Sequence, residues 1–149
     1  MANDLDRLSR KMRQTAIQIE TGATVMTRKV ALAIDQTLVI ATPVDTGRAR
    51  SNWVVEVGTQ PTRDTREPYS PGDRGNTGAA NAAAAIAQGQ QAVMSYNRED
   101  EYIFITNNLN YIKDLNEGKS PQAPPGFVQT AIARGVSVAR GYNILRSSS

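Results

Sequence analysis

One long periodic pattern at the start of the chain restricts its fold more than any other feature. Between residues 3 and 41, apolar or small side chains recur at alternating spacings of three and four. The mean spacing is close to 3.6 residues, the period of a straight amphipathic helix rather than of a coiled coil. We predict a helix over residues 3–41, almost 60 Å long at about 1.5 Å per residue. Gly22 predicts a kink or break inside it, and Thr42-Pro43 predicts its end.

The rest of the chain alternates shorter patterns with turn signals. Alternating β-branched and aromatic residues predict strands, while alanine-rich or 3.6-periodic segments predict helices. The predicted strands are residues 51–58 and 102–107, and the predicted helices are 79–95, 111–118 and 125–145. We therefore expect one α+β domain over residues 1–149, in which the long N-terminal helix and the C-terminal helix pack on a small antiparallel β-sheet.

The composition predicts a thin core. Aromatic residues make up only 5% of the chain, so Ala, Val, Ile, Leu and Met must fill the interior. The strand at 102–107 is largely apolar on both faces, which predicts a helix on one face and a second helix or a neighbouring subunit on the other. We hypothesise that neighbouring subunits complete part of the apolar surface.

Residues 59–80 form a long segment without periodicity, rich in proline and glycine. Loops of this length are usually functional or disordered, and in an assembly protein such a loop is a candidate arm that orders against a neighbour. Its glycines at 72, 75 and 78 lack the ending of a phosphate-binding loop. A single GxxG piece resembles the clamp of KH nucleic-acid-binding domains only weakly.

The residues that are missing exclude several chemistries. The chain has no cysteine and no histidine, which excludes disulfides, thiol nucleophiles and Ser-His triads and leaves few ways to bind zinc. No apolar run is long enough to span a membrane, and the first 40 residues are too charged for a signal peptide. We expect no cofactor, no metal site and no membrane association, and a reducing compartment fits the composition.

Charge is distributed unevenly along the chain. The net charge is +3, yet the last 32 residues carry four basic residues and no acidic one. This pattern indicates either a solvated basic face on the last helix or a surface that meets an acidic partner or nucleic acid. The acids at Glu99/Glu101 and Asp114/Glu117 make poor catalytic pairs, because neighbours on one strand entry or one helix turn do not face each other across a substrate.

The segment after the first helix contains a turn signal and two arginines. Asp45-Thr46-Gly47 predicts a turn, since Asp bonds nearby backbone amides and Gly tolerates a positive φ. Arg48 and Arg50 follow, and on an extended backbone they would share one face. Trp53 is most simply a core residue.

The segment from residue 106 to 128 reads as a rigid joint rather than an active-site loop. Gly118 is expected to stop a short helix, the prolines to hold a fixed bend, and Gly126 to open the last helix. Two roles stay open for Glu117: an exposed helix end, or an ion pair to Arg48 or Arg50 that fixes the turn. Tyr111 is expected either to pack against polar neighbours or to anchor an interface.

Two segments now stand in order: ATPVDTGRARSNWVVEVG at 41–58 and YIFITNNLNYIKDLNEGKSPQAPPGFV at 102–128. Together they resemble the tail-component family of long-tailed bacteriophages, small neck or tail-completion proteins at the head–tail junction. The matching positions are Thr42, Pro43, Asp45, Thr46, Gly47, Arg50, Trp53, Asn107, Tyr111, Leu115, Glu117, Gly118, Ser120, Gln122, Ala123, Pro124 and Gly126. The departures are Ala49 in place of the usual Leu, Asn116 inserted before Glu117, and Pro125 before the glycine.

The resemblance implies a virion structural protein and no enzyme. The resemblance also implies a small α+β domain that assembles as a homo-oligomeric, hexameric ring between the connector and the tail tube. The implied partners are identical copies, the connector or adaptor, and the tail terminator or tube proteins. Genomic DNA would pass the lumen without sequence-specific binding. The implied location is the virion's head–tail junction, after synthesis in the host cytoplasm.

Two alternatives remain beside this reading. Within the same class, the chain is a candidate tail terminator or stopper ring. From another class, a nucleic-acid-binding module would use the basic last helix and the GDRG loop. The candidate interface and structural residues are Asp45, Thr46, Gly47, Arg48, Arg50, Trp53, Tyr111, Glu117, Gly118, Ser120, Gln122, Pro124 and Gly126.

Overall fold

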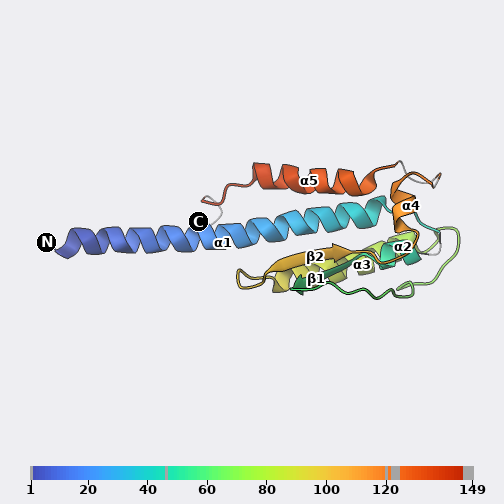
Figure 1. Ribbon diagram of the computed structural model, residues 1–149, viewed down its shortest axis with the longest axis horizontal. Helices are drawn as coiled ribbons and strands as arrows, with labels where there is room; N and C mark the ends of the chain where they lie inside the picture. The colour runs from blue at the N-terminus through green and yellow to red at the C-terminus, as the bar shows by residue number, and fades with distance from the viewer. Residues whose placement is uncertain (1, 46, 120, 122–124, 146–149) are drawn as a thin grey trace.

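The structure is a computed structural model that describes residues 2–45, 47–119, 121 and 125–145. A long helix forms its axis, with the last helix along one side and a small sheet with its own helix along the other (Figure 1). The predicted α+β architecture is confirmed. In chain order the elements are α1 (Ala2–Ala41), α2 (Arg48–Ser51), β1 (Val54–Gly58), α3 (Gly78–Ser95), β2 (Tyr102–Thr106), α4 (Ile112–Asn116) and α5 (Phe127–Gly141).

The helix α1 is continuous, so the break predicted at Gly22 is wrong. Its C-terminal half packs against α5 and the sheet, whereas every residue from 3 to 21 is exposed. This first half extends beyond the rest of the molecule as an arm (Figure 1). Within the described residues, no helix combines the length and apolarity needed to cross a membrane.

The two strands pair antiparallel, as predicted, with Val55 opposite Ile105 and Val57 opposite Ile103. Both α1 and α3 pack on the face that carries Val55, where Ala31 and Val93 complete a small apolar cluster. The opposite face carries Tyr102 and Phe104, whose ring centroids lie 5.6 Å apart. Tyr102 is 53% exposed, so the second covering layer expected over this strand stays a prediction.

A second cluster joins the end of α1 to Trp53, α3 and α5. Its buried members are Leu38, Val39, Trp53, Ala82, Ala85, Phe127 and Ala131. Trp53 is the largest of them, which confirms its predicted place in the core. Alanines supply much of the contact surface of α3, and this explains how few aromatic residues suffice.

The crossing of α1 and α5 depends on a missing side chain. Gly135 is buried on α5, and a Cβ built there would lie 2.5 Å from Ile34 Cγ1 on α1. Glycine at this position allows the two backbones to approach closely. Ile132 and Val136 on the same helix are 52% and 44% exposed.

The long loop between β1 and α3 is bound to its own domain. Asn52 uses its side-chain amide on the backbone of Arg66, accepting from its N–H at 2.8 Å and donating to its carbonyl at 2.9 Å. The fully buried Asn81 does the same with Ser70, at 2.8 Å in both directions. The chain therefore orders this loop without a neighbour.

Candidate assembly site

Gly47 adopts the positive φ that the sequence predicted, but the backbone that follows is not extended. Gly47 has a φ of 84°, in the left-handed region that the Asp-Thr-Gly turn signal indicated. Arg48 and Arg50 then lie in the helical turn α2. Residues two apart on a helix do not face the same way, so the prediction that these arginines share a face is wrong.

Arg50 connects three elements through backbone carbonyls. Its Nε donates to the Thr42 carbonyl at 3.0 Å, and its two Nη atoms donate to the carbonyls of Ile40 and Gly78 at 2.9 and 3.2 Å. Ile40 belongs to the last turn of α1, whose free carbonyls carry negative partial charge. Arg50 thus caps α1 and holds α3 against it, while burial lowers the pKa of its guanidinium.

Trp53 is fixed by a chain of two hydrogen bonds. Its indole Nε1 donates to Thr42 Oγ1 at 2.7 Å, and that hydroxyl donates to the Leu38 carbonyl at 2.6 Å. A buried indole N–H usually requires such a partner. Thr42 therefore ends α1 and orients the main core aromatic residue at once.

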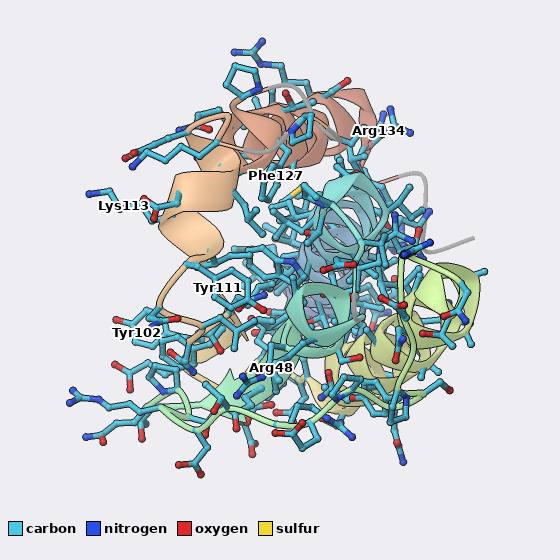
Figure 2. The ribbon with its side chains drawn as sticks, turned by 90° about the vertical axis from the view of Figure 1, so that its right-hand side faces the viewer. Arg48, Tyr102, Tyr111, Lys113, Phe127 and Arg134 are labelled. Atoms are coloured by element: carbon cyan, nitrogen blue, oxygen red, sulfur yellow. The ribbon has the colours of Figure 1, made fainter. Side chains whose placement is uncertain are left out.

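The two motif segments meet in space. Asn107 Nδ2 donates to the Ala49 carbonyl at 2.9 Å, across 58 residues of sequence. Tyr111 lies close enough to Arg48 and Asp45 to sense their charges: burial raises the pKa of its hydroxyl, Arg48 opposes this rise and Asp45 adds to it. Figure 2 shows Arg48 and Tyr111 on the end of the molecule where α2 and α4 lie.

Gly118 ends α4 as predicted. The N–H of Gly118 donates to the Leu115 carbonyl at 3.2 Å, and the N–H of Lys119 donates to the Asp114 carbonyl at 3.1 Å. These two bonds define a Schellman motif, in which the residue after the C-cap adopts a left-handed conformation. Gly118 has a φ of 88°, and a Cβ there would lie 3.0 Å from Pro125 Cβ.

Asn116 fixes the start of α5. Its carbonyl accepts from Gly126 N–H at 2.7 Å, and its Oδ1 accepts from Val128 N–H at 2.9 Å. The first N–H groups of a helix lack partners within the helix, so this side chain replaces the local cap that Gly126 cannot supply. Sequence reasoning missed this role, because the partners of Asn116 lie 10 and 12 residues further along the chain.

Glu117 has neither of its proposed arginine partners in the described residues. Its carboxylate is exposed and lies 3.9 Å from Lys113 Nζ and 3.8 Å from Lys119 Nζ. The ion pair of Glu117 with Arg48 or Arg50 is therefore wrong, and the exposed carboxylate agrees with the helix-end role. Thr46, Ser120, Gln122 and Pro124 lie outside the described residues.

One buried acid was not singled out from the sequence. Asp35 is fully buried on α1 and lies against α3 at Gly89. Neither carboxylate oxygen has a hydrogen-bond partner among the described residues. Burial raises the pKa of Asp35 from 3.8 to about 7. The sequence did not indicate that Asp35 is buried, because this residue is not one of the periodic apolar positions of α1.

The described residues contain no cluster of three or more acidic side chains able to hold a metal ion. Asp114 and Glu117 both lie near Lys119, with Asp114 Oδ1 2.9 Å from its Nζ, and all three side chains are largely exposed. What the site residues do is hold backbone segments at fixed angles. Comparison of the chain with family models, curated proteins and solved structures yields no match.

Proposed function

We propose that this chain is a virion structural protein of the head–tail junction of a long-tailed phage, a tail-completion or neck ring component between connector and tail tube. The observation that carries the proposal is the contact between its two motif segments. The Asn107 amide on the Ala49 carbonyl brings together the two stretches on which the family resemblance rests. The two segments also contain the paired strands β1 and β2, so they form one continuous region of the fold.

The way in which the motif residues are used also supports a structural role. Arg50 and Trp53 direct their polar atoms to the end of α1. Gly118 and Asn116 fix the angle between α4 and α5. These side chains therefore fix the relative positions of backbone segments. In the proposed ring, the resulting shape presents one copy to the next, and genomic DNA passes through the lumen.

The same fold also suits a tail terminator or a stopper ring, because each of these roles requires a small ring-forming domain. A nucleic-acid-binding module is the alternative from another class, and its support is the exposure of Arg134 and Arg140 on α5. Ile132 and Val136 are exposed on the same helix. A face of mixed apolar and basic residues suits a protein partner better than a phosphate backbone.

Complementation tests the proposal. A phage that lacks the gene should produce filled heads and separate tails, and the wild-type chain supplied from a plasmid should restore joined virions. Gly118→Val should give a soluble chain that restores few of them, because valine strains the corner that positions α5. Gly141→Val, at an exposed position with open space around it, is the matched control. Normal virions from the deletion phage would refute the proposal.

For the nucleic-acid alternative, a gel shift of duplex DNA at low salt is the direct assay. Binding that weakens steeply with salt and requires Arg134 and Arg140 would favour that alternative. We expect no shift.

A further inference from the structure

The exposed first half of α1 carries an apolar stripe that this chain does not cover. Leu5, Leu8 and Met12 are 73%, 54% and 64% exposed, and Ile19 is 47% exposed. Their spacings of three, four and seven place them on one face of the helix. We call residues 3–21 the arm. An exposed apolar stripe of this kind indicates a surface that binds a partner.

The second half of α1 forms the floor of an open apolar groove. The groove has a volume of about 450 Å³ and lies between α1, β2 and the end of α5. Its floor includes Met26 and Val30, which continue the arm's stripe seven and eleven residues beyond Ile19. Its other walls include Tyr102, Ile103 and Ala139, with Glu101 also lining it.

Arm and groove match in length. Leu5, Leu8 and Met12 span seven residues, about 10 Å along a helix at 1.5 Å per residue. The groove floor from Met26 to Ile34 spans eight residues on α1, about 12 Å by the same rise. The three arm side chains and the groove floor therefore each cover about two helical turns.

Charge favours the same pairing. Residues 3–13 of the arm contain four basic and two acidic side chains, a net of +2. Beside the groove, Glu99, Asp100 and Glu101 form an acidic turn at the start of β2. Both Glu99 and Glu101 are exposed. Opposite charges at the rim of an apolar contact orient the partners and increase the rate of association.

We propose that the arm of one copy binds in the groove of a neighbouring copy of the same chain. Arm and groove are different surfaces, so one such contact leaves a free arm and a free groove, and only a closed assembly fills them all. The inference rests on the proposed function only in assuming that identical copies are neighbours in an assembly. Beyond that function, it identifies the two surfaces through which the copies bind.

Cysteine cross-linking tests the contact directly, because the native chain contains no cysteine. Full-length chains carrying Leu5→Cys, Leu8→Cys or Met12→Cys are each mixed with chains carrying Val30→Cys and oxidised. At least one mixture should yield a disulfide between the two different chains. Residues 8 and 30 are about 33 Å apart on one helix, far beyond the roughly 7 Å that a disulfide permits. The cross-link therefore reports a contact between copies.

Ile17→Cys is the matched control. Ile17 is 61% exposed on the same arm, but it lies off the stripe, so it should not cross-link to Val30→Cys. Dimers joined only through arm residues would indicate arm-to-arm pairing and overturn the proposal. Equal cross-linking of Ile17→Cys and Leu8→Cys, or no cross-link at all, would also overturn it.

A charge exchange gives an independent readout by sedimentation velocity. Leu8→Asp should weaken self-association by about 100-fold or more, since it places a carboxylate in the apolar groove, whereas Ile17→Asp should leave it unchanged. Lys11→Glu and Glu101→Lys should each weaken it, and the double variant should restore it. A wild-type chain that stays monomeric and uses the arm to bind anionic lipid vesicles or DNA would overturn the inference.

Failure here is distinguishable from failure of the proposed function. The cross-link uses purified chain alone, whereas complementation uses infected cells. A chain that joins heads to tails without an arm-to-groove cross-link keeps the function and overturns the contact. A chain that cross-links, but whose deletion leaves virions normal, supports the contact and overturns the function.

Discussion

The side-chain oxygen of Asn116 accepts a hydrogen bond of 2.9 Å from the backbone N–H of Val128, and this bond ties the end of α4 to the start of α5. The Asn116 carbonyl accepts a second bond from Gly126, at 2.7 Å. Two bonds to one residue therefore hold the start of the last helix at the end of α4.

Replacing this side chain should destabilise the protein. Asn116→Ala leaves Val128 N–H without its acceptor, and the loss of a helix cap costs about 1 kcal/mol, with about 2 as an upper value. Urea denaturation measures the change. Asn116→Asp keeps the acceptor and adds negative charge at the N-terminus of α5, so its stability should stay near that of the wild type. Equal loss in both variants would contradict the capping role.

The Schellman turn predicts a cost for any side chain at Gly118. Gly118→Ala places a Cβ in the left-handed region, which costs about 1–2 kcal/mol, and brings it within 3.0 Å of Pro125. Thermal unfolding should show a lower midpoint. An unchanged or higher midpoint would mean that the φ of 88° at this corner is not required.

Two glycines of α5 should respond in opposite directions to alanine. Gly135→Ala meets Ile34 at 2.5 Å, and overpacking typically costs about 1–3 kcal/mol, more than the gain of about 1 kcal/mol in helix propensity. Gly141→Ala meets nothing within 4 Å and should be neutral or slightly stabilising. Chemical denaturation of the two variants side by side measures the difference. Stabilisation by Gly135→Ala would show that the α1–α5 contact is looser than described.

Asp35 makes the stability depend on pH. Burial raises its pKa from 3.8 to about 7, so between these values the folded state holds a proton that the unfolded state releases. The stability that this bound proton adds to the folded state is fully present below about pH 4 and is lost as the pH rises to 7. At 1.36 kcal/mol per pH unit, the free energy of unfolding falls by about 4 kcal/mol over this range. The comparison is the free energy of unfolding of wild type and Asp35→Asn at pH 5 and pH 8. The free energy of unfolding of Asp35→Asn should rise relative to that of the wild type as the pH rises. Parallel pH profiles of the two proteins would contradict this explanation.

The periodic parts of the fold could be predicted from the sequence, because each residue's environment there repeats at a local spacing. The 3.6-residue period located α1, and alternation located β1 and β2. Gly118 was also predictable, since a glycine after a short helix is a local signal for its end. The short helix α2 was not, because four residues carry no period and Arg50 reaches carbonyls of α1 and α3 to hold it.

The parts that could not be predicted depend on partners far away in the sequence. Asn81 accepts from Ser51 Oγ at 2.9 Å across 30 residues, and Asn116 bonds to Val128 across 12. From its sequence neighbours alone, an asparagine is expected in a turn or at a helix cap. Those neighbours do not indicate which distant group it will bond. The same limit left two roles open for Glu117, although its ion pairs in the described residues are with Lys113 and Lys119.

Electron microscopy of the phage particles that we propose contain this chain tests the central claim most directly. The account predicts a closed ring of identical copies between connector and tail tube, with residues 5–12 of each copy lying along α1 and β2 of the next. A reconstruction in which this junction contains no copy of the chain, or in which isolated copies touch no neighbour through the arm, would contradict it.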